Sequence, residues 1–130
     1  MQRWGITILR IVVGTVFLMH GGQKLFVYGF HATAGFLSHL GFPYPLVMAV
    51  ILTLTEFLGG IALIVGLFTR WVAVALAIVM TVALFKVHLH GGFFLPNGVE
   101  YVVTLLAANL CLALAGAGML AVDNIMRHKG

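Results

Sequence analysis

Four long apolar segments constrain this chain more than any other feature. A helix needs about 20 residues to cross the hydrocarbon of a membrane, and each segment reaches that length with only one or two internal polar groups. Proline, glycine and short polar turns separate the segments. We therefore predict an all-α integral membrane protein, a four-helix bundle that forms a single transmembrane domain over residues 1–130. The expected spans are residues 4–25, 46–68, 71–90 and 99–122.

The composition disfavours most soluble classes of protein. Hydrophobic residues make up 62% of the chain and charged residues 8%, whereas a soluble domain carries about a quarter of charged residues. Intrinsic disorder, nucleic-acid binding and an ordinary soluble enzyme are therefore poor interpretations. Cys111 is the sole cysteine, so the chain has no internal disulfide, no paired-cysteine thiol relay and no c-type haem attachment site.

Basic residues indicate the orientation in the membrane. Arg3 precedes the first span, Arg70 separates the second from the third, and Arg127 and Lys129 follow the fourth. With four spans these three places share one face, which the positive-inside rule assigns to the cytoplasm, so we expect both termini inside. On the other face, the stretch from His31 to Leu40 is too short to span and is suited to a short re-entrant or interfacial helix.

Ionisable side chains inside the spans indicate a structural or functional role, because insertion of each one into the membrane costs about 2.5–3.5 kcal/mol on insertion scales. On the first span, Arg10, Phe17, His20 and Lys24 follow a spacing that keeps them on one helix face. Glu56 lies near the middle of the second span, closer to the midplane than the end of the first. Intramembrane acids are usually functional, which makes this carboxylate the leading candidate.

The third span ends with Lys86 and His88, and the fourth begins with Glu100 and Tyr101. In the expected orientation these residues lie in the outer half of the bundle, together with the end of the first span. A bundle can bring all of them and Glu56 round one cavity that opens toward the outer leaflet. Two pairings would keep the carboxylates ionised: Glu56 with Arg10 or Lys24, and Glu100 with Lys86 or His88.

The same residues could have purely structural roles, whereas the sequence disfavours metal sites. Lys24 near a helix end can extend its ammonium group to the interface, and Glu56 with a basic partner can fix the helix register. A di-iron site is disfavoured because neither Glu56 nor Glu100 begins a Glu-x-x-His motif. A b-type haem held by His20 and His88 is also disfavoured, since nothing in the sequence requires one.

Three motifs run in order along nearly the whole chain. They are Arg10-x-x-x-Gly14-x-x-Phe17-x-x-His20-Gly21-x-x-Lys24-Leu25, then Glu56-x-x-Gly59-Gly60-x-x-Leu63-x-x-Gly66-x-x-Thr69-Arg70, then His88 before Gly91-Gly92-Phe93-Phe94 and Glu100-Tyr101. Together they resemble the DoxX family of small four-span bacterial membrane proteins. Related proteins include subunits of an archaeal thiosulfate:quinone oxidoreductase and members associated with quinone exposure. The resemblance implies a redox setting, a link to membrane quinones and a location in the bacterial inner membrane.

We therefore hypothesise a quinone-linked redox protein that acts alone or as the membrane subunit of a complex. A quinone site is an apolar cleft with a few convergent donors and proton-exchanging groups. The sequence contains no electron carrier, so a redox partner or second substrate must supply electrons. The expected catalytic residues are Glu56 and His20, and the expected ligand-binding residues are Arg10, Phe17, Lys24, His88, Glu100 and Tyr101.

Two other classes of function are open. A transporter for protons or a small polar solute predicts an oligomer, with polar residues continuing to the inner face, where Arg10 is the sole candidate. A scaffold that docks a redox enzyme predicts a fully paired polar cluster without a cavity. Expected partners are the lipid bilayer, a membrane quinone or small aromatic ligand, and a redox partner protein or a second copy of the chain, but no nucleic acid.

Overall fold

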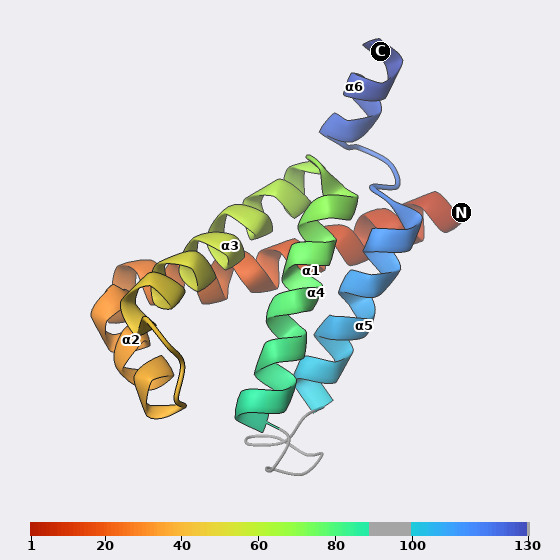
Figure 1. The fold of residues 1–130 in the computed structure, drawn as a ribbon. Coiled ribbons are helices and arrows are strands. Elements are labelled where there is room, and N and C mark those ends of the chain that lie inside the picture. The colour runs from red at the N-terminus through yellow and green to blue at the C-terminus, as the bar shows by residue number, and fades with distance from the viewer. Residues whose placement is uncertain (89–99, 130) are drawn as a thin grey trace.

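The computed structural model describes residues 1–88 and 100–129, and these residues form helices without strands. The prediction of an all-α bundle is confirmed (Figure 1). The elements are the α-helices α1 (Gln2–Gly22), α2 (Gly29–His39), α3 (Pro45–Val65), α4 (Thr69–Ala83), α5 (Glu100–Ala115) and α6 (Val122–Lys129), and the π-helical segments η1 (Gln23–Tyr28) and η2 (Leu84–His88).

Three helical runs in the described residues are long and apolar enough to cross a membrane: residues 2–39, 45–65 and 69–86. The apolar helix over residues 101–115 is shorter. At 1.5 Å per residue it reaches roughly 22 Å, less than the hydrocarbon thickness of about 30 Å. This helix alone is therefore shorter than a full crossing of the hydrocarbon.

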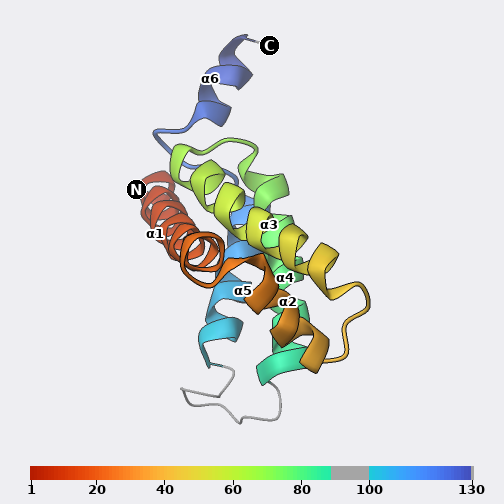
Figure 2. The same cartoon turned by 90° about the vertical axis from the view of Figure 1, so that its left-hand side faces the viewer.

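The long helices associate mainly in pairs, α1 with α3 and α4 with α5. The two pairs cross in Figure 1, and the view in Figure 2 shows α2 folded back beside α3. A core of aliphatic side chains and Phe17 joins the pairs. A smaller apolar cluster of Ala34, Leu37 and Ala49 fixes α2 against α3. We call the end of the bundle that carries α2 the α2 end, and the end that carries the α3–α4 turn the hinge end.

Glycines bring the backbones of α1 and α3 into close contact. A Cβ atom added at Gly14 would lie 2.8 Å from the carbonyl oxygen of Gly60, and one added at Gly21 would collide with the backbone of Phe57. Gly60 in turn faces the backbone of Leu18. Small residues at such crossings allow dispersion contacts that lipid cannot replace. These contacts set the depth of α1 relative to α3.

The hinge between the second and third spans lies earlier than predicted. We expected Thr69 and Arg70 to form it, but both belong to the first turn of α4. The chain turns at Gly66, which has φ of 75°, and at Phe68, so the second span ends at Val65 rather than at Phe68. The Asp123 carboxylate accepts hydrogen bonds from the backbone N–H groups of Phe68 and Thr69, and therefore caps α4.

The fourth span also ends earlier than predicted. We expected it to continue to Val122, but α5 ends at Ala115 and a separate helix, α6, begins at Val122. Gly116 and Gly118 have φ of 86° and 73°, a left-handed conformation that glycine adopts without strain. The Arg10 guanidinium then donates hydrogen bonds to three carbonyl oxygens of the turn, those of Ala117, Met119 and Leu120.

The remaining boundaries differ less. The first span begins at Gln2 and continues beyond Leu25 through the π-helical turn η1. The helix predicted between the first two spans is confirmed as α2, two residues earlier than expected at its start. The third span begins at Thr69 and runs through η2 to His88, and its predicted last two residues lie outside the described part of the chain.

Candidate functional site

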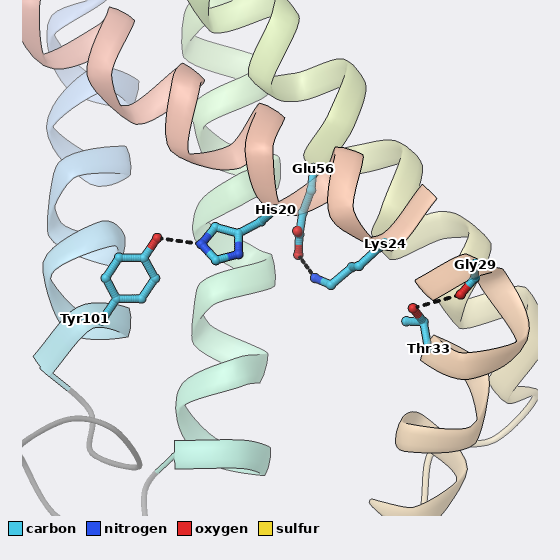
Figure 3. A network of polar contacts seen from close by, with 6 residues as sticks. All are labelled: His20, Lys24, Gly29, Thr33, Glu56 and Tyr101. Carbon is cyan, nitrogen blue, oxygen red and sulfur yellow. Dashed lines mark hydrogen bonds and ion pairs between the residues drawn. The ribbon is translucent and has the colours of Figure 1, made fainter. Parts of the chain in front are cut away.

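An ion pair between α1 and α3 is the centre of the candidate site (Figure 3). The Lys24 ammonium donates to Oε1 of Glu56 over 2.7 Å. Lys24 lies in the π-helical turn just after Gly21, and the contact of Gly21 with Phe57 brings this turn level with Glu56. Of the two partners that the sequence left open for Glu56, Lys24 is therefore the one that the fold provides.

The second oxygen of Glu56 lacks a protein donor. Its side chain is 4% exposed, and Oε2 has no hydrogen-bond partner among the described residues. Thr53, one turn toward the α2 end, is fully buried and its hydroxyl also lacks a partner there. An unsatisfied buried oxygen costs roughly 1–3 kcal/mol. This site therefore holds acceptor capacity that a ligand, a water molecule or a proton can satisfy.

Sequence reasoning missed Thr53. Its spacing of three residues from Glu56 places both side chains on one face of α3, and this spacing was the signal that could have identified it. A hydroxyl at this position can donate as well as accept a hydrogen bond. Thr53 therefore belongs with Glu56 as a buried polar group of α3.

A second polar contact links α1 to α5. His20 Nε2 and the Tyr101 hydroxyl lie 2.9 Å apart, and their ring centroids are separated by 5.8 Å. In Figure 3 the imidazole lies between the phenol ring and the Glu56–Lys24 pair. The site thus combines ionisable groups from three helices.

An open groove of about 550 Å³ runs along the outside of α1 beside this site. Its wall is mostly apolar and contains His20, Gln23 and Phe57. His20 is exposed on the bundle surface, so its ring connects the lipid-facing groove to the contact with Tyr101. A flat, apolar molecule with polar atoms at one end fits a groove of this kind.

The other predicted site residues lie elsewhere or lack a described side chain. Phe17 is 1% exposed and packs in the hydrophobic core rather than in the groove. Arg10 is buried near the hinge end, where it binds carbonyl groups, so the fold does not bring it to Glu56. The side chains of His88 and Glu100 lie outside the described residues.

Among the described residues, no three His, Cys, Asp or Glu side chains come close enough to hold a metal ion. Lys86, which the sequence offered as a partner for Glu100, is exposed and its ammonium lies 5.8 Å from the centre of the Phe42 ring. This cation–π geometry stabilises the contact between η2 and the α2–α3 connection. Neither observation adds a group to the site around Glu56.

Comparisons with known proteins agree with the motifs. The family model described as DoxX matches residues 5–89. An uncharacterized protein of Haemophilus influenzae is 37% identical over 92% of this chain and 88% of its own length. "Putative oxidoreductase CatD" of Bacillus subtilis is 33% identical over 92% and 84%, and the inner membrane protein YphA of Escherichia coli is 31% identical over 91% and 87%. No solved structure matches the chain.

Proposed function

Since the chain belongs to the DoxX family of membrane proteins, we propose that it is a bacterial inner-membrane protein with a quinone-linked redox function. The observation that carries the proposal is the Glu56 carboxylate, which is paired to Lys24 through one oxygen and lacks a described donor at the other. The oxidoreductase name of the Bacillus subtilis relative and the inner-membrane name of an Escherichia coli relative support the same direction.

The residues present fit the head group of a quinone. A quinone takes up two electrons and two protons to become a hydroquinone, whose hydroxyl groups donate hydrogen bonds. The unpartnered Glu56 Oε2 is an acceptor for such a donor. Glu56 is buried and does not line the groove, so the head group must pass beyond the groove wall to reach it. His20 stands at the edge of the apolar groove, so its imidazole can hydrogen-bond a ring oxygen while Phe57 packs against the ring. The opening of the groove on the bundle surface lets a lipid-soluble molecule enter sideways from the bilayer.

The protein's own groups supply protons and orientation. The Tyr101 hydroxyl holds one edge of the His20 ring and fixes its direction. The Lys24 ammonium lies beside the carboxylate, so Glu56 is not left as an isolated charge when it releases a proton. When Glu56 holds the proton, the remaining charge is on Lys24, which is the more exposed of the two partners. The electrons come from a reduced redox partner protein, because the side chains of this site do not carry electrons.

A binding titration tests the proposal. We would titrate the purified protein in nanodiscs, under anaerobic reducing conditions, with a short-chain benzohydroquinone or naphthohydroquinone, whose hydroxyl groups can donate to Glu56. The bound fraction would be measured by equilibrium dialysis. Glu56→Gln and His20→Ala should each weaken binding about tenfold, the effect of losing one charge-assisted hydrogen bond of roughly 1.5 kcal/mol. Lys86→Gln changes an exposed cation outside the site and is the matched control.

The outcomes separate the three classes of function. Hydroquinone binding that Glu56→Gln and His20→Ala leave unchanged contradicts the proposal. Flux of protons or a small solute in proteoliposomes that disappears in Glu56→Gln would assign a transporter instead. The scaffold hypothesis requires a fully paired cluster, and the unpartnered oxygen of Glu56 in the described structure argues against it.

A further inference from the structure

A second groove, far from the candidate site, lies at the hinge end of the bundle. It has a volume of about 940 Å³ and is formed by the first turns of α1 and α4, the turn after α5 and the start of α6. Its polar wall contains Arg3, Arg70, Thr69 and Asn124. Unlike the groove beside His20, this one combines two guanidinium groups with the Asp123 carboxylate and uncharged hydrogen-bonding side chains.

The two arginines reach the same short turn from different helices. The Arg70 guanidinium lies against Gly116, where an added Cβ would be 3.0 Å from Nε. Arg3 donates to the carbonyl oxygen of Gly118 over 3.1 Å. Asn124 donates to the same carbonyl over 2.8 Å. The turn therefore holds both guanidinium groups at one groove instead of letting them extend freely into water.

Positive charge exceeds negative charge among the described residues of this groove, which are Arg3 and Arg70 against Asp123. The acid in the wall, Asp123, uses both carboxylate oxygens to cap the start of α4. The ion pair between Lys24 and Glu56 at the α2 end is the only one in the described part of the chain, so neither Arg3 nor Arg70 has a carboxylate partner there. Two guanidinium groups that are not paired with a carboxylate form a binding site for a planar or tetrahedral oxyanion.

Two further observations point to the ligand. Thr69 lines the groove and is 1% exposed. Its hydroxyl has no hydrogen-bond partner among the described residues. Phe68 and Trp71, also in the wall, are exposed. Aromatic side chains of this kind are typical of the membrane–water interface, which is the level at which lipid phosphate groups lie.

We propose that this groove binds a phosphate group through Arg3 and Arg70, with the phosphodiester of an anionic lipid head group as the natural source. Arg70 and Arg3 contact the phosphate oxygens, and Trp71 and Phe68 contact the adjoining glycerol and acyl region. A bound phosphate would link α1 and α4 to the turn after α5. The site is independent of the quinone-linked function, because it shares none of that site's residues.

Native mass spectrometry of the detergent-solubilised full chain tests the proposal. The protein would be titrated with phosphatidylglycerol, with zwitterionic phosphatidylcholine of the same acyl chains, and with inorganic phosphate. Phosphatidylglycerol should bind more tightly than phosphatidylcholine. Arg3→Gln and Arg70→Gln should each reduce that preference about fivefold, which corresponds to roughly 1 kcal/mol for a basic residue at an anionic surface. Lys86→Gln, an exposed cation at the other end of the bundle, is the control.

The remaining outcomes are decisive. If inorganic phosphate displaces phosphatidylglycerol at millimolar concentration, the site binds phosphate but its natural source is a soluble one. If phosphatidylglycerol has no advantage over phosphatidylcholine, the proposal is wrong. It is equally wrong if both arginine variants behave like Lys86→Gln. Arg3 lies in the exposed first turn of α1, so Arg3→Gln keeps the test valid even if Arg70→Gln fails to fold.

Discussion

Lys24 and Glu56 form an ion pair across the α1–α3 contact in which the two partners are unequally buried. The Lys24 side chain is 26% exposed and that of Glu56 is 4% exposed. The ammonium can therefore recover contact with polar surroundings if the pair is broken, whereas the carboxylate cannot. Because of this difference in burial, removal of Lys24 and removal of Glu56 should have different effects on stability.

Removal of the lysine should be more harmful than removal of the acid. Lys24→Met leaves a buried carboxylate without its cation, which typically costs about 3–5 kcal/mol. Glu56→Gln leaves a neutral amide beside a lysine that can move outward, so its loss in unfolding free energy should be smaller. The measurement is reversible unfolding in one fixed detergent, with Lys86→Met as control. Equal losses for Lys24→Met and Lys86→Met would show that the pair does not stabilise the bundle.

Glycine substitutions should separate the α1–α3 contact from general effects on helices. Gly21→Ala places a methyl group against the backbone of Phe57, which cannot move away without separating the helices. Overpacking of this kind costs about 1–3 kcal/mol, and we expect a lower thermal midpoint. Gly5→Ala, on the same helix with nothing within 4 Å of the added Cβ, should leave the midpoint unchanged or raise it. A similar decrease for both variants would contradict the close contact.

The same glycines explain why the partner of Glu56 could be predicted only as one of two residues. Hydropathy identified the spans, and helical spacing placed Arg10 and Lys24 on one face of the first span. The choice between them depends on how far α1 slides along α3. That depth is set by backbone contacts such as that of Gly21 with Phe57. The spacing of small residues in the sequence does not show which of them form the contact.

The end of α5 could not be predicted for a related reason. The stretch from Gly116 to Val122 is apolar except for its glycines, so its hydropathy stays high and gives no sign that the helix ends. What ends the helix is a left-handed turn held by Arg10, a residue more than 100 positions away. For the same reason, the sequence alone assigned Arg10 to the ligand site. The contact between His20 and Tyr101 was closer to expectation, because both residues were predicted in one cluster.

Arg10 should therefore behave as a structural residue. Arg10→Met removes three hydrogen bonds to carbonyl oxygens of the turn after α5, and the loss of several charge-assisted bonds should exceed about 3 kcal/mol. Arg3→Met, which removes one exposed bond, is the matched control and should cost far less. Unfolding free energies in detergent give the comparison. Quinone affinity per folded molecule should stay the same in Arg10→Met, and a selective loss of affinity would return Arg10 to the ligand site.

The orientation of the bundle gives the last prediction. Arg3 and Arg70 both lie at the hinge end, and the positive-inside rule places that end in the cytoplasm. The free Cys111 would be replaced by serine, and single cysteines introduced at exposed positions, Gln2, Phe68 and Met126 at the hinge end and Ser38 in α2. A membrane-impermeant maleimide should label Ser38→Cys in intact spheroplasts, and the other three only after permeabilisation. Labelling of Gln2→Cys but not Ser38→Cys in intact spheroplasts would reverse the assignment, and the acidic site around Glu56 would then lie nearer the cytoplasm.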